Sequence, residues 1–117
     1  MIDQFSRFAG SYRDLARVSD AVLGVIQQGR ADLSLRQIAI LLTLVLDPGP
    51  HTVRGLAARL CVCKPVITRA LNRLGELGFA AREMDPRDKR NRMVSIQPAG
   101  ADWLAALFDL QAEGAAG

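Results

Sequence analysis

The chain has 117 residues, half of them hydrophobic, and a formal net charge of +3. This length suits one domain that buries a core without disulfides, and the hydrophobic content excludes an intrinsically disordered chain. Only 5% of the residues are aromatic, which argues against a stacking platform for single-stranded nucleic acid. The first residues lack a signal-peptide pattern, and the longest apolar stretch, Ile38 to Leu46, is too short to cross a bilayer, so we expect a cytoplasmic protein with no membrane partner.

The first third of the chain predicts two helices. Apolar residues recur at three- and four-residue steps over residues 2–28, which is typical of an amphipathic helix, and Gly29 ends it. A second helix is predicted over residues 34–46, where Ser34 and Gln37 have the spacing of a capping box. This second helix is apolar nearly all round, so we expect it at the centre of the core.

Two short helices follow and form a helix-turn-helix unit. Thr52 is a candidate N-cap for a helix over residues 52–60, and a tight turn separates that helix from another over residues 64–77, which Gly78 ends. In a helix-turn-helix the second helix is the element that enters the major groove of DNA.

The remainder of the chain predicts a hairpin and a final helix. Residues 79–84 and 92–96 have the pattern of two strands, and residues 85–91 form a polar, turn-rich tip between them. A proline then begins an amphipathic helix over residues 98–113. We therefore predict a mainly α fold with a small β-hairpin (α+β), and a single domain over residues 1–117.

The helix over residues 64–77 separates an apolar half from a polar half on a helical wheel. A charged helix face is most often only solvated, but this one combines cations that bind phosphate with side chains that pair with base edges, Arg with guanine and Asn with adenine. This combination favours double-stranded DNA as the partner. The residues assigned to the groove-facing surface are Lys64, Pro65, Thr68, Arg69, Asn72 and Arg73.

The hairpin carries more basic than acidic residues, which is typical of a nucleic-acid footprint. An arginine at a narrow hairpin tip reaches the minor groove, and Asp88 is placed to hold Arg90 by an ion pair. A helix for one groove and a basic hairpin for the next is a winged-helix arrangement. The hairpin residues assigned to DNA are Arg87, Asp88, Lys89, Arg90 and Arg92.

Five runs between residues 34 and 100 form a recognisable set: Thr52-Val-Arg-Gly-Leu56-Ala57, Lys64-Pro-Val-Ile-Thr68-Arg69-Ala-Leu71-Asn-Arg73-Leu74, Leu77-Gly78-Phe79, Asp85-Pro-Arg-Asp88-Lys-Arg90 and Ile96-Gln-Pro-Ala-Gly100. Together they resemble the MarR family of bacterial winged-helix transcriptional regulators. The resemblance implies a homodimer that binds a pseudo-palindromic operator, usually as a repressor, with the recognition helix in the major groove and Arg90 in the minor groove.

The resemblance also implies that the terminal helices, residues 2–28 and 98–113, form the dimerisation region. Their apolar stripes fit that role, because each exposes hydrophobic surface on a lone monomer. The chain departs from the family in its short final helix and in Gln97 and Cys63, which replace the usual helix-capping residues. The expected interface residues are Phe5, Phe8, Tyr12, Leu15, Trp103, Leu107 and Phe108.

The two cysteines, Cys61 and Cys63, raise two alternatives. A metal site is not expected, because zinc takes about four ligands and the chain offers only one histidine besides the cysteines. Redox sensing is an alternative function. Cys63 begins a helix near Lys64 and Arg59, which favours the reactive thiolate, and oxidation there would disturb the recognition helix. A small buried residue is the plainer interpretation of either cysteine.

The sequence also bears on a small-molecule effector, a protein-interaction role and an enzyme activity. No cofactor is expected, but Tyr12, His51 and Arg36 are candidates for contacts to a small-molecule effector of the kind that the family binds. A protein-interaction module or co-regulator is the alternative from another class, and it would need large apolar anchors on the recognition face. An enzyme is not expected, because no catalytic arrangement is visible and one histidine leaves little acid–base chemistry.

Overall fold

The computed structural model describes residues 6–108 and divides into two compact units. Within the described part, unit 1 comprises residues 6–32 and 105–108, and unit 2 comprises residues 33–104. The described part is mostly helical with a small sheet, which confirms the predicted fold class. No helix of this described part is both long and apolar enough to span a membrane.

Unit 1 is built on the long helix α1 (Tyr12–Gln27), which follows a 3₁₀ helix, η1 (Ser6–Ser11). Gly29, with φ of 64°, ends α1, as predicted. The prediction of one α-helix from residue 2 was wrong for residues 6–11, where Gly10 lowers helix propensity and the backbone winds more tightly. Residues 2–5 lie outside the described part.

Unit 2 has a core made by three helices, α2 (Leu35–Leu46), α3 (Val53–Leu60) and α4 (Lys64–Glu76). Its innermost side chains are all aliphatic, and burying each of them contributes roughly 1.5–3 kcal/mol. Both predicted N-caps are confirmed: the side chains of Ser34 and Thr52 accept backbone hydrogen bonds at 3.1 and 2.9 Å. The fully buried side chains are Ile40, Leu41, Leu56, Ile67, Leu71 and Leu74.

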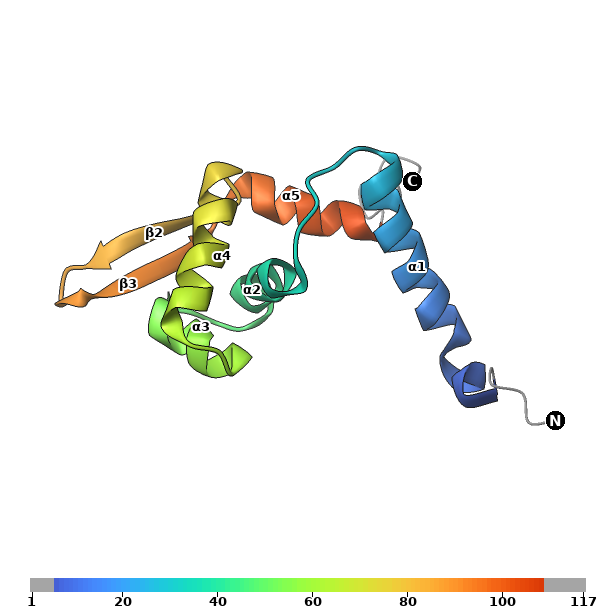
Figure 1. Ribbon diagram of the computed structural model, residues 1–117, viewed down its shortest axis with the longest axis horizontal. Coiled ribbons are helices and arrows are strands. Elements are labelled where there is room, and N and C mark those ends of the chain that lie inside the picture. Colours follow the sequence, from blue (N-terminus) through green and yellow to red (C-terminus); the bar gives the residue numbers. More distant parts are fainter. Residues whose placement is uncertain (1–5, 109–117) are drawn as a thin grey trace. The chain divides into compact units, whose positions relative to one another are not determined.

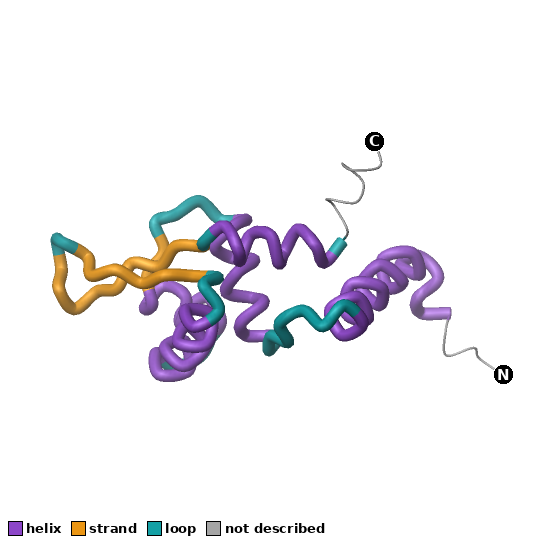
Figure 2. Tube along the Cα trace, turned by 90° about the horizontal axis from the view of Figure 1, so that it is seen from above, coloured by secondary structure: helices purple, strands orange, loops and turns teal. Residues whose placement is uncertain are grey.

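A three-stranded antiparallel sheet completes unit 2, with β3 (Asp88–Ile96) between β1 (His51–Thr52) and β2 (Ala80–Asp85). The β2–β3 hairpin extends away from α3 and α4 (Figure 1), and its two strands run side by side to the tip (Figure 2). Strand β1 was not predicted, because its partner residues lie in β3, far along the chain. The predicted tip was too long, since β3 already begins at Asp88 and pairs there with Asp85.

Helix α5 (Pro98–Leu107) begins directly after the sheet. Its first turn lies against the backbone of Phe79, so closely that a Cβ on Gly100 would be 2.3 Å from the carbonyl oxygen of Phe79. Only glycine fits this approach. Trp103 is buried and stacks at a tilt on Phe79, with ring centroids 6.5 Å apart. The predicted extension of the helix over residues 109–113 lies outside the described part.

Candidate nucleic-acid interface

Helix α4, the predicted recognition helix, buries its apolar half and exposes its polar half, as its sequence predicts. Its apolar half packs against α2, α3 and β2, where Ile67 and Leu74 are wholly buried. Of the side chains assigned to DNA, Thr68 is half-buried and the others are exposed. The polar half is therefore available to a partner. The exposed members are Lys64, Pro65, Arg69, Asn72 and Arg73.

The turn before α4 is closed by backbone hydrogen bonds and left-handed geometry. Cys61 ends α3 with φ of 58°, and Val62 N donates to the carbonyl of Ala57 at 3.0 Å. Cys63 stands at the N-cap of α4, as predicted, but its side chain makes no capping hydrogen bond. Both thiols are exposed, and Arg59, the cation expected near Cys63, forms an ion pair with Asp47.

Two aspartates organise the hairpin tip, which we call the wing (residues 85–92). Asp85 accepts a backbone hydrogen bond from Arg87 at 2.9 Å, and Asp88 accepts one from Arg90 at 3.0 Å. The Asp88 carboxylate also lies 3.6 Å from Nε of Arg90, which is the ion pair expected from the sequence. The Arg90 side chain remains 89% exposed, so the tip is held while its arginine projects outward.

Between α4 and the wing lies a concavity of about 320 Å³, which we call the cationic groove. Six of its nine lining residues are cationic, and none is a carboxylate. A concave surface lined by one sign of charge concentrates its potential and attracts anions. The lining residues are Val53, Arg54, Lys64, Thr68, Arg82, Lys89, Arg90, Asn91 and Arg92.

The cationic groove brings together only part of the predicted set and adds four residues that were not assigned to DNA from the sequence, two of which are cations. Arg54 comes from the first turn of α3 and Arg82 from β2. Both are ordinary basic residues in sequence, and only the fold shows that they converge on α4. Arg69 instead borders a smaller hollow beside Arg36 of α2. The other predicted residues outside the lining of the groove are Pro65, Asn72, Arg73, Arg87 and Asp88.

The MarR family model matches residues 31–91, which include the helix-turn-helix and most of the wing. The chain belongs to the MarR family. It is 33% identical over 111 residues to a helix-turn-helix-type transcriptional regulator of Mycobacterium leprae, covering 91% of this chain and 73% of that protein. A second such regulator, from Mycobacterium tuberculosis, is 33% identical over 101 residues, covering 80% of this chain and 70% of that one.

Solved structures agree with this assignment. The crystal structure of MarR itself is 26% identical and superimposes with a TM-score of 0.65, covering 88% of this chain and 77% of the other. A transcriptional regulator of Thermotoga maritima shares the fold with a TM-score of 0.70 at 21% identity, covering 93% and 75% of the two chains. This MarR-family chain is a DNA-binding transcriptional regulator.

The residues expected at the dimer interface differ in their exposure. Tyr12 and Leu15 on α1 are 63% and 46% exposed. Phe8 and Leu107 are half-buried, Phe108 is exposed, and Phe5 lies outside the described residues. Trp103 is only 6% exposed and belongs to the core of unit 2, which leaves little of its side chain for a partner. The other large apolar side chains exposed on α1 are Val18, Val22, Leu23 and Ile26.

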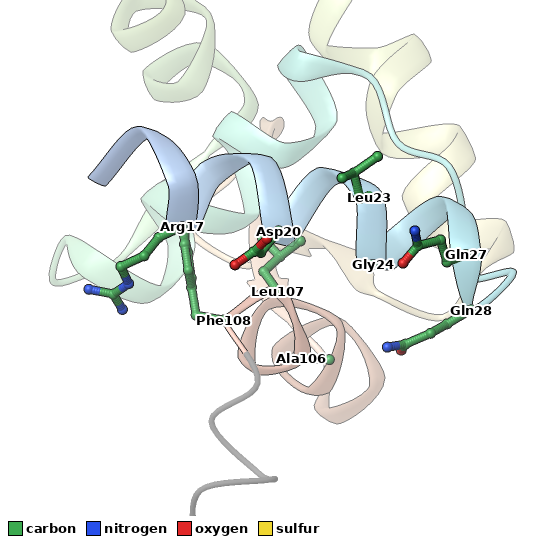
Figure 3. A pocket seen from close by; sticks show the side chains of 9 residues that line it. All are labelled: Arg17, Asp20, Leu23, Gly24, Gln27, Gln28, Ala106, Leu107 and Phe108. Atoms are coloured by element: carbon green, nitrogen blue, oxygen red, sulfur yellow. The ribbon is translucent and has the colours of Figure 1, made fainter. Parts of the chain in front are cut away.

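A cavity of about 440 Å³ lies in unit 1, between α1 and the end of α5 (Figure 3). It is open and mixes polar and apolar side chains, and the guanidinium of Arg17 lies 5.3 Å from the ring centre of Phe108. None of the three predicted effector contacts lines it. Tyr12 borders another hollow of α1, Arg36 lies beside Arg69, and the His51 ring hydrogen-bonds to the Asp47 carbonyl at 3.0 Å.

Proposed function

We propose that this chain is a homodimeric repressor that binds a pseudo-palindromic operator, with α4 in the major groove and the wing in the adjacent minor groove. One observation carries the proposal. Polar side chains of α4 and cations of the wing, distant in sequence, line a single concave surface whose nine residues include six cations and no acid. Such a surface matches the phosphate-lined edge of a duplex.

The exposed half of α4 supplies the chemistry for both affinity and specificity. Arg69 and Arg73 are exposed and present planar donors that pair with guanine in the major groove. Lys64 lies in the first turn, where free backbone N–H groups and the helix dipole also favour a phosphate. Base contacts from the middle of α4 and phosphate contacts from its ends would then fix the register on the duplex.

The wing supplies the minor-groove contact. Arg90 is the most suitable residue, because Asp88 holds its backbone and Nε while the side chain remains 89% exposed. A narrow minor groove has an enhanced negative potential that attracts an inserted arginine. Arg87 and Lys89 are exposed beside it and would add phosphate contacts.

The dimer follows from the apolar surface of α1. Tyr12, Leu15, Val22 and Ile26 have helical spacing on one face, and each is at least 46% exposed. Contiguous apolar surface of this kind marks a protein–protein contact. A twofold dimer would present two copies of α4 to half-sites about one helical turn of DNA, roughly 34 Å, apart.

The experiment that tests this function is selection of genomic DNA fragments by the purified protein. The proposal predicts enrichment of one inverted repeat, with half-site centres about 10 base pairs apart. A promoter carrying that repeat should then lose activity when the protein is expressed. Failure to enrich any sequence, with stable capture of a protein partner instead, would favour the interaction-module alternative. Against that alternative, no large apolar residue is exposed on described α4.

A second function, redox sensing through Cys63, is supported by the exposure of its thiol at the N-cap of α4. Oxidation would place a bulkier polar sulfur beside Lys64, which lines the cationic groove. Peroxide should therefore release the operator from the wild type but not from Cys63→Ser. Equal release from both proteins would exclude Cys63 as the sensor.

A further inference from the structure

A side-chain hydrogen bond joins the recognition helix to the strand that leads into the wing. Nη2 of Arg82 on β2 donates to Oδ1 of Asn72 on α4 at 2.6 Å, across ten positions of sequence. Both side chains are exposed. Of the two, only Arg82 lines the cationic groove.

This bond restricts what Asn72 can offer to a base. A guanidinium has only donors, so the amide must turn its single oxygen toward Arg82 and its nitrogen away. Pairing with adenine needs both ends of the amide, the oxygen accepting from N6 and the nitrogen donating to N7. The bond to a charged donor is roughly twice as strong as a neutral one, which favours keeping the oxygen where it is.

The same bond orders Arg82. A free arginine side chain loses rotamer entropy when it is immobilised, and the bond to Asn72 accounts for part of that loss before DNA binds. One N–H of Arg82 is used by Asn72, and the others remain for a partner in the fork geometry that matches a phosphate. The position of Arg82 in the lining of the cationic groove brings those donors to the proposed path of the DNA backbone.

We propose that Arg82 binds a backbone phosphate of DNA and that Asn72 is its positioning residue rather than a reader of adenine. The inference rests on the proposed function and assigns the contact at the junction of helix and wing. It predicts that Asn72 contributes to affinity for every sequence and that Arg82 contributes one phosphate contact to the salt dependence of binding.

The test is a double-mutant cycle on the full chain, using the selected operator duplex and a scrambled duplex over a range of salt. Arg82→Ala should weaken operator binding about 10-fold and reduce the slope of log affinity against log salt by about one. Asn72→Ala should weaken binding by about 3- to 5-fold, reduce that slope in part and leave the preference at every base pair unchanged. The double variant should bind no more weakly than Arg82→Ala alone.

Arg13→Ala is the matched control, because it removes one exposed cation from α1 and leaves the cationic groove intact. Relaxed preference at one base pair in Asn72→Ala, with an unchanged slope and additive losses in the double variant, would show that Asn72 reads a base and overturn the inference. The inference would also be overturned if the slope of log affinity against log salt were the same for Arg82→Ala as for Arg13→Ala. Wild-type protein that binds operator and scrambled duplex equally would instead refute the proposed function.

Discussion

Helices α4 and α1 are both amphipathic, but α4 leaves its polar face exposed and α1 leaves its apolar face exposed. α4 buries its apolar half in the core of unit 2 and exposes arginine, lysine and asparagine. α1 buries only Ala21 and Val25, while large apolar residues remain exposed along its length. The chemistry of the exposed face therefore indicates the partner, an anionic polymer for α4 and another apolar surface for α1.

The largest effect is expected from shortening a buried side chain of α4, which tests whether the apolar half of this helix anchors the core. Leu71 is 2% exposed, so Leu71→Ala should lower the free energy of unfolding by about 2–5 kcal/mol through lost burial and the cavity that remains. Urea denaturation followed by circular dichroism measures this change. A loss below about 1 kcal/mol would mean that α4 does not anchor the core.

A charge placed on the exposed apolar face of α1 should weaken the dimer rather than the fold of the subunit. Leu15→Glu puts a carboxylate into the proposed dimer interface, where an unpaired charge costs several kcal/mol, so the dimer should dissociate by more than about 100-fold. Sedimentation velocity gives the oligomeric state. The control is Arg13→Glu, which places the same charge on the side of α1 that points away from the apolar face. A dimer that survives Leu15→Glu as well as it survives the control would place the interface elsewhere.

Substitution on the exposed side of α4 should affect binding without affecting folding. Arg69→Ala should lose about 1–3 kcal/mol of operator binding, because a bidentate pair with guanine is worth that much discrimination. Loss should be greatest for the operator and small for a scrambled duplex in a fluorescence titration. Equal losses on both duplexes would make Arg69 a phosphate contact instead.

The smallest expected effect belongs to the wing. Arg90→Ala should reduce the salt slope of binding by about one and weaken affinity modestly for all sequences, since the contact is mainly electrostatic. Lys89→Ala, at the neighbouring position of the wing, shows what removal of a flanking cation does. Full retention of slope and affinity in Arg90→Ala would exclude the wing from the interface.

Local patterns in the sequence were enough to predict the helix-turn-helix, the caps at Ser34 and Thr52 and the outward face of α4. These features depend on residues three or four positions apart. Pairings across long sequence separations were not predictable in this way. Strand β1, the convergence of Arg54 and Arg82, and the bond from Arg82 to Asn72 all depend on where the sheet lies relative to α4.

For the terminal helices, the sequence pattern assigned more residues to a dimer interface than the structure leaves exposed. Periodicity places Trp103 in an apolar stripe of its helix. It does not distinguish a side chain that packs in the core, as Trp103 does on Phe79, from one that stays exposed for a partner protein. Tyr12 and Leu15 show the same periodicity and are exposed. Only tertiary packing separates these cases, because the apolar pattern is identical for a core and for an interface.

Footprinting of the operator bound by wild-type protein tests the central claim most directly. Dimethyl sulfate reports the major-groove N7 of guanine and hydroxyl radicals report the minor-groove edge of the backbone, so the two grooves are distinguished on one duplex. The account predicts two protected guanine sites about one helical turn apart, lost in Arg69→Ala, and flanking minor-groove protection, lost in Arg90→Ala. Protection that is unchanged by both substitutions would contradict the assignment of α4 and the wing to DNA.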